Sequence, residues 1–188
     1  QSPLWRIRPR RASPPVAAGG RRGVAARGAR GAGGGASTGS GQRGAGGVSD
    51  TQPDWDNTAM VRSAGDGVWR RTFSLPAGSF NYFAALDGTL DVVYGRNGIP
   101  SGFSPVTLNL PAPTAVSFYF AEATHWVTDG FTSVIASLAG NFQSELGCAA
   151  DFQPGCLRSW LQDVDGDGLY TFTTTDIPAG LYSAVVAI

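Results

Sequence analysis

Three aspartates in the C-terminal part of the chain have the spacing of a calcium-binding loop. Asp163, Asp165 and Asp167 alternate along the chain, and Gly168 takes the sixth position of such a loop. The twelfth position is Thr174, whereas a complete loop has a glutamate there that binds the ion through both oxygens. Carboxylates beside glycine are also common in ordinary turns. We therefore predict a turn, keep the three aspartates as a weak calcium candidate, and assign no cofactor.

The two cysteines, Cys148 and Cys156, are separated by seven residues. Two cysteines and one histidine are too few ligands for a zinc site. A local disulfide in a secreted protein and a pair of free thiols both fit this spacing, and we favour the disulfide.

No set of side chains has the pattern of a catalytic centre. Glu122 and Glu145 could serve as a glycosidase pair only if their carboxylates lay about 5 to 9 Å apart, and nothing in the sequence places them so. The chain also has no room for a (β/α)8 barrel. His125 has no serine or cysteine motif to serve. We expect solvated acids, a structural histidine and no catalysis.

A unit of two turns and two strands occurs twice and organises the rest of the chain. In the earlier copy, Gly65-Asp66-Gly67 leads into an aromatic strand, and Pro76-Ala77-Gly78 reverses the chain into an apolar strand. Gly166-Asp167-Gly168 and Pro178-Ala179-Gly180 do the same in the later copy. The period of about one hundred residues, with a one-residue slip, is too long for a solenoid and favours tandem small β domains.

Charge separates residues 1–47 from the remainder. Nine of the fourteen arginines precede Val48, all fourteen acidic residues follow it, and lysine is absent. The Gly/Arg/Ala-rich residues 1–47 cannot bury enough apolar surface to offset the entropy of ordering, so we predict disorder. A solvated linker, a nucleic-acid arm and a stretch that is not native coding sequence remain open. Nucleic acid is the least favoured, because aromatic residues beyond Trp5 are missing.

Short strands without helical periodicity predict an all-β fold. The odd-numbered residues from Trp69 to Leu75 alternate onto one strand face, and Val106–Leu110 and Ala115–Phe120 flank three turn residues as a hairpin. This spacing favours an immunoglobulin-like β-sandwich over residues 48–129. No apolar run is long enough to span a membrane, and the start lacks the hydrophobic core of a secretion signal.

A second module of the same kind is predicted over residues 130–188. It begins with a strand near Ser133–Gly140, and a short helical turn after Cys156 should point Leu157, Trp160 and Leu161 inward. Strands equivalent to residues 87–129 do not follow, and nothing before Trp55 resembles the Ser133–Gly140 strand. We therefore expect both modules to be incomplete, with an open sheet edge and apolar face after Gly130.

Several motifs occur in the same order as in a known family. They are Asn141–Cys148, Asp151–Leu157, Trp160–Tyr170 and Ile177–Tyr182 in the later copy, and Gly67–Trp69, Leu75–Phe80 and Thr124–Asp129 in the earlier one. Over about residues 54–188 the chain resembles a tandem of the X25 module of bacterial pullulanases and related secreted amylolytic enzymes. Leu90 departs from that pattern, since members have an aromatic residue there, and the first module lacks the cysteine pair.

The resemblance implies a non-catalytic, extracellular accessory module of an α-glucan-degrading enzyme. Its partners would be starch, glycogen or pullulan and the catalytic domain of the parent chain. Sugars bind by stacking on flat aromatic rings. Trp55, Tyr94 and Trp126 lie in loop-like or terminal contexts, so we expect them to contact carbohydrate, whereas Trp69 and Tyr170 suit the core.

Two other classes of function compete with this one. A structural spacer that merely positions a catalytic domain would keep the same fold, and alanine at the three loop aromatics would leave glucan affinity unchanged. A basic nucleic-acid-binding arm on an acidic β domain would show salt-sensitive RNA binding that disappears when residues 1–47 are removed.

Overall fold

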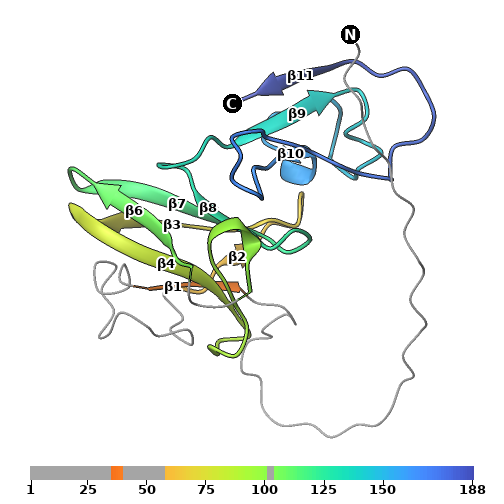
Figure 1. The fold of residues 1–188 in the computed structure, drawn as a ribbon. Coiled ribbons are helices and arrows are strands. Elements are labelled where there is room, and N and C mark those ends of the chain that lie inside the picture. Colours follow the sequence, from red (N-terminus) through yellow and green to blue (C-terminus); the bar gives the residue numbers. More distant parts are fainter. Residues whose placement is uncertain (1–34, 40–57, 101–103) are drawn as a thin grey trace, which may run out of the picture.

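The computed structural model describes residues 35–39, 58–100 and 104–188, and the described chain consists of short strands (Figure 1). The strands are β1 Gly35–Gly39, β2 Val61–Arg62, β3 Trp69–Leu75, β4 Gly78–Leu86, β5 Val93–Tyr94, β6 Val106–Leu110, β7 Thr114–Ala121, β8 Trp126–Asp129, β9 Ala136–Gly140, β10 Trp160–Leu161 and β11 Ala184–Ala187. The 3-10 turn η2 Arg96–Gly98 lies between β5 and β6, and the 3-10 turn η3 Leu157–Ser159 lies between β9 and β10. The predicted all-β class is confirmed. None of the described segments is a helix long and apolar enough to cross a bilayer.

Strands β1–β8 form the first unit, in which two antiparallel sheets enclose a core. One sheet has β4 at its centre, paired with β1, β5 and β6; the other has the order β2-β3-β7-β8. Buried side chains from both sheets meet between them, among them Leu108 from β6 and Phe120 from β7, each 0 % exposed. The alternation expected in β3 holds, since Trp69 and Leu75 are buried and Thr72 and Ser74 are exposed. The immunoglobulin-like order of connections stays a prediction.

The connections β3–β4 and β6–β7 carry the chain from one sheet to the other. β6 pairs with β4, whereas β7 pairs with β3 and β8, so the predicted hairpin around residues 111–113 is wrong. Each of these strands has one buried face, and alternation alone cannot distinguish strands that pair from strands that face each other across a core. Prolines at positions 76, 111 and 113 lie in these connections, where no ladder hydrogen bond needs an N–H.

β1 corrects two expectations at once. It lies inside residues 1–47, which we predicted to be disordered, and it takes the place of the strand that we predicted to be missing. Gly39, the last residue of β1, pairs with Tyr82 of β4. In the second unit Gly140, the last residue of β9, pairs with Ala184 of β11, so β1 corresponds to β9 and β4 to β11. The sequence Gly-Ala-Ser-Thr-Gly carries no large apolar residue, so no alternation marks it as a strand.

The second unit, β9–β11 with the loops up to Ile188, is seen above the first unit in Figure 1, and its strand pairing repeats part of that of the first. The bridge Gln162–Thr171 corresponds to the pair Val61–Arg70 of β2 and β3, so the hairpin that contains each Gly-Asp-Gly turn has the same register in both units. β11 pairs on one side with β9. Val185 and Val186 point to opposite faces of β11 and are both 59 % exposed, and the incompleteness of this unit stays a prediction.

Candidate functional site: the cleft between the two units

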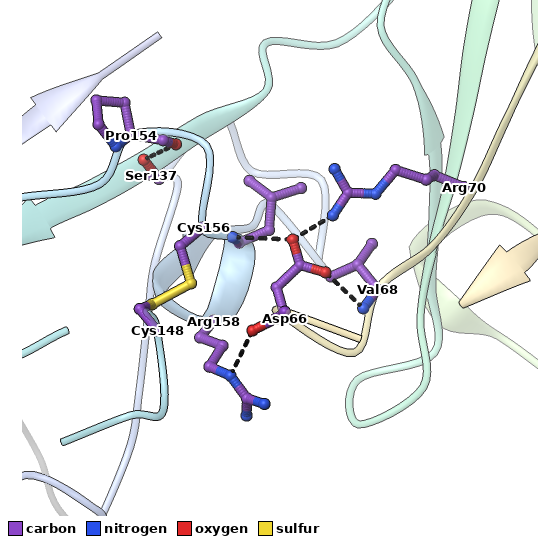
Figure 2. A network of polar contacts seen from close by, with 10 residues as sticks. Asp66, Val68, Arg70, Ser137, Cys148, Pro154, Cys156 and Arg158 are labelled. Atoms are coloured by element: carbon purple, nitrogen blue, oxygen red, sulfur yellow. Dashed lines mark hydrogen bonds and ion pairs between the residues drawn. A yellow bond between two sulfur atoms is a disulfide. The ribbon is translucent and has the colours of Figure 1, made fainter. Parts of the chain in front are cut away.

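The Gly-Asp-Gly turn of the first unit docks on the turn η3 of the second unit (Figure 2). The carboxylate of Asp66 accepts hydrogen bonds from the backbone N–H of Val68 at 3.1 Å, from the guanidinium of Arg70, and from the N–H of Leu157 at 3.3 Å. The Nε of Arg158 donates to the carbonyl of Gly65 at 2.9 Å. Gly67 has φ +77°, a conformation that favours glycine and lets the turn close.

An apolar cluster lies beside these polar contacts and joins the two units; we call it the junction cluster. Its buried members are Val68, Ala121, Trp126, Leu157 and Trp160. The Trp126 and Trp160 rings lie 4.9 Å apart at 52°. Leu157, Trp160 and Leu161 are all at most 7 % exposed, which confirms the inward orientation predicted for the turn after Cys156. The junction therefore combines directional hydrogen bonds with apolar burial.

A cleft of about 770 Å³ opens at this junction and is lined by both units. Val68, Leu157 and Trp160 supply apolar lining and are buried. Arg62, Glu122 and Thr173 line it as exposed polar residues. The lining mixes many polar residues with the apolar ones, and the volume lies within the range of small-molecule sites.

The charges along the cleft largely satisfy one another. Arg62 Nε lies 3.6 Å from an oxygen of Glu122, and the same oxygen accepts from the indole N–H of Trp69 at 3.4 Å. Burial favours the neutral form of Asp66 and raises its pKa, but hydrogen bonds from Arg70, Ser63, Val68 and Leu157 outweigh burial and hold this pKa below its ordinary value. Asp66 is therefore an ionised hydrogen-bond acceptor in the junction and does not serve as a proton donor.

The three aromatic residues predicted to contact carbohydrate lie in different environments. Trp55 falls outside the described residues. Tyr94 is half-buried against the sandwich core, and its ring stacks on His125 at 4.1 Å and 7°. Trp126 is only 5 % exposed, so the expectation of an exposed loop residue is wrong. β8 is buried on both faces, because Val127 packs in the sandwich core and Trp126 in the junction cluster.

The calcium candidate has the geometry of a hydrogen-bonded turn. One ligand oxygen from each of Asp163, Asp165 and Asp167 lies within 4.8 Å of the others. An oxygen of Asp163 accepts the N–H of Gly168 at 3.2 Å, and an oxygen of Asp167 accepts the N–H of Leu169 at 2.8 Å. Two of the three carboxylates thus already serve the turn, and calcium binding stays a weak prediction.

The loop that precedes η3 is closed by a covalent bond and by a buried amide. Cys148 and Cys156 form a disulfide with an S–S distance of 2.08 Å. Gln143 is 0 % exposed; its Nε2 donates to the carbonyl of Gln153 at 3.0 Å, and its Oε1 accepts the N–H of Gln153 at 2.6 Å. These bonds fix the loop that carries Leu157 and Arg158 to the first unit.

Sequence reasoning missed the cleft itself. Arg62, Glu122, Arg158 and Thr173 come from four separate segments, and none belongs to a local motif. The repeated Gly-Asp-Gly turn was the one visible signal, but a repeat does not reveal that one copy docks on the other unit. Tyr94 and Trp126 belong to different clusters and are not brought together.

Comparisons with known proteins agree on one family. A family model for the pullulanase X25 domain matches residues 36–127 and 135–188, which includes most of β1. An amylopullulanase of Thermoanaerobacterium saccharolyticum is 31 % identical over 140 residues, which are 70 % of this chain and 10 % of that protein. An amylopullulanase of Thermoanaerobacter thermohydrosulfuricus is 27 % identical over 150 residues, 76 % of this chain and 10 % of that protein.

A solved structure is also similar to part of this chain. Pullulanase from Bacillus acidopullulyticus aligns with a TM-score of 0.46 and 24 % identity, over 54 % of this chain and 12 % of that chain. The chain thus spans about a tenth of the length of the curated relatives that it matches.

Proposed function

Because this chain belongs to the pullulanase X25 domain family, we propose that it is a non-catalytic accessory module that holds α-glucan for a secreted pullulanase-type enzyme. The observation that carries the proposal is the family match, which extends over both units. The relatives are amylopullulanases, and pullulan and starch are α-glucans, so a module beside their catalytic machinery would meet these polymers. The disulfide between Cys148 and Cys156 suits an extracellular location.

The three aromatic residues predicted from the sequence have different roles in this proposal. Tyr94 is half-buried and its ring stacks on both His125 and Phe120, so a sugar would meet only the exposed remainder of this side chain. Trp55 remains a candidate contact. Trp126 takes a supporting role, because it is buried and packs against Trp160, which lines the cleft.

Native electrophoresis of the intact chain in gels with and without amylopectin tests this function. We expect the chain to migrate more slowly in the amylopectin gel than a non-binding protein of similar size. Unchanged mobility of a chain shown to be folded by circular dichroism would overturn glucan binding. The relative migration at several polysaccharide concentrations gives the dissociation constant.

A structural spacer is the second candidate, and the junction favours it. Asp66, Arg158 and the junction cluster fix the two units to each other, as expected of a part that sets the distance between other domains. A spacer predicts no retardation in the amylopectin gel. It also predicts that Trp55→Ala and Tyr94→Ala leave any residual affinity unchanged.

Nucleic-acid binding by the arginine-rich residues stays a separate prediction. These residues, apart from β1, lie outside the described part of the chain. Binding of a single-stranded RNA probe at low salt, weakened by added salt and lost when residues 1–34 are removed, would support it.

A further inference from the structure

We propose that the cleft between the two units is the site that binds an α-glucan oligosaccharide. This inference rests on the proposed function and adds to it a location, a set of residues and a requirement for both units. Tyr94 and Trp126, the two predicted aromatic residues that the structure describes, do not line this cleft. The site therefore differs from the one expected around these two residues.

The lining provides the two kinds of contact that a sugar needs. Phe172 is half-buried and lines the cleft, so part of its ring is open to stack on the apolar face of a glucose residue. Trp160 and Leu157 add buried apolar surface from the second unit. Thr171 and Thr173 also line the cleft and are exposed, so their hydroxyl groups can exchange hydrogen bonds with a ligand.

The charges favour a neutral ligand. Arg62 is paired with Glu122, Asp66 is satisfied by Arg70 and two backbone N–H groups, and Arg158 donates to the carbonyl of Gly65. Taken together the charged lining residues are two arginines and three acids, Asp176 being the third acid, so neither sign dominates. An anion or a cation would disturb these pairs. Sugar hydroxyls both donate and accept hydrogen bonds, so they can join such pairs without adding charge.

The cleft exists because the two units are docked. Arg62 and Glu122 belong to the first unit, whereas Trp160, Phe172 and Thr173 belong to the second. The hydrogen bond from the N–H of Leu157 to Asp66 and the junction cluster hold these two sets at a fixed separation. A repeated unit without its partner would lack one side of the site.

Trp160 also offers a way to observe binding. Its ring lies in the lining, is 3 % exposed, and its indole N–H has no hydrogen-bond partner among the described residues. A ligand that enters the cleft alters the surroundings of this indole, and the change should appear in the tryptophan emission.

The test titrates the whole chain with maltoheptaose, with cellohexaose as the β-linked control. Isothermal titration calorimetry measures the affinity of every variant, and tryptophan emission is followed for the wild type. Ala123 is exposed and lines the cleft, so Ala123→Trp should fill it. Ala112 is exposed in the β6–β7 connection and is not a lining residue, so Ala112→Trp is the matched control. Thr173→Trp is a second blocking variant for the case that Ala123→Trp does not fold.

We expect the wild type and Ala112→Trp to bind maltoheptaose equally, and the blocking variants to bind at least roughly tenfold more weakly, a loss of about 1.4 kcal/mol. If folded Ala123→Trp and Thr173→Trp bind like the wild type, the cleft is not the site, and the proposed function still stands. If the wild type neither binds maltoheptaose nor is retarded by amylopectin, the proposed function itself fails.

Discussion

The carboxylate of Asp66 accepts a hydrogen bond from the backbone N–H of Leu157 at 3.3 Å, although the two residues lie 91 positions apart (Figure 2). Asp167 occupies the equivalent place in the second unit, where it keeps the local bond, to the N–H of Leu169, and is exposed. The same turn thus serves two purposes: it reverses the chain in both units, and in the first it also binds the other unit.

Asp66→Asn should weaken the junction. The amide can still accept from Val68, but it loses the charge that holds Arg70 and Leu157. Hydrogen bonds to charged groups are worth more than neutral ones, and partial solvent screening reduces the difference, so we expect a loss of about 1–2 kcal/mol in the free energy of unfolding. Urea denaturation measures it. Asp167→Asn is the matched control and should cost less, because its carboxylate bonds only within its own turn.

The effect of Asp66 depends on pH in a defined direction. Its folded-state pKa lies below the ordinary value, so its contribution to stability is present above the unfolded-state pKa of 3.8 and is lost as the pH falls through the folded-state pKa. Asp66→Asn should therefore lose more stability near pH 7 than near pH 3. An equal loss at both pH values would contradict this role of the charge.

Tyr82→Phe should destabilise the sandwich core. Tyr82 Oη donates to Asp129 Oδ2 at 2.7 Å, and Asp129 is 0 % exposed. Removing the hydroxyl leaves a buried carboxylate with one donor fewer, at a cost of about 1–3 kcal/mol in thermal or urea unfolding. Tyr182 donates to the carbonyl of Pro178 at an exposed position, so Tyr182→Phe should be close to neutral.

Tyr82 should also resist ionisation. Burial, and then the charge and hydrogen bond of Asp129, raise the pKa of Tyr82 well above its ordinary value of 10.0. Its contribution to stability is present below the unfolded-state pKa and is lost as the pH rises through the folded-state pKa. In an alkaline absorbance titration, one of the five tyrosines should therefore ionise only when the chain unfolds.

The disulfide should be required for full stability. The two cysteines are 8 positions apart, and cross-linking so short a loop stabilises a fold by about 2–3 kcal/mol in the chain-entropy model. We expect Cys148→Ala/Cys156→Ala to lose that amount, and intact-mass spectra with and without reductant to differ by the mass of two hydrogen atoms. Identical masses would show that the thiols are free.

The open face of β11 should promote self-association. Val185 and Val186 are both 59 % exposed on a strand that is paired on one side by β9. Unpaired strand edges with apolar side chains pair readily with other chains. Val186→Lys should reduce the fraction of oligomers in sedimentation velocity, whereas Ala112→Lys, which adds the same charge in a remote turn, should leave that fraction unchanged.

The repeat was the most reliable guide in the sequence. Matching Gly67 with Gly168 predicts two similar turns, and the equal registers of Val61–Arg70 and Gln162–Thr171 agree with it. Local chemistry defines such turns, since Gly67 and Gly168 both have a positive φ, which favours glycine. The strand β9 and the inward orientation of Leu157 and Trp160 follow from apolar spacing alone.

The predictions that proved wrong concern features that depend on tertiary contacts, and such contacts leave no local signal in the sequence. β1 has the composition of a linker and becomes a strand because β4 pairs with its backbone. Trp126 lies beside His125 in a stretch that was predicted to end the first module, yet residues of the second unit cover it. β6 and β7 alternate as partners would, but they face each other in different sheets. To predict each of these three features, one must know which distant segment of the chain packs against it or pairs with it.

The central claim is that the two docked units hold an α-glucan between them. Titration of the 15N-labelled chain with maltoheptaose, followed by amide chemical shifts, tests it most directly. We predict that the shifted resonances cluster in the segments 121–124, 157–162 and 171–174, which contain residues that line the cleft. The absence of shifts, or shifts confined to residues away from the cleft such as β4 and β6, would contradict the account.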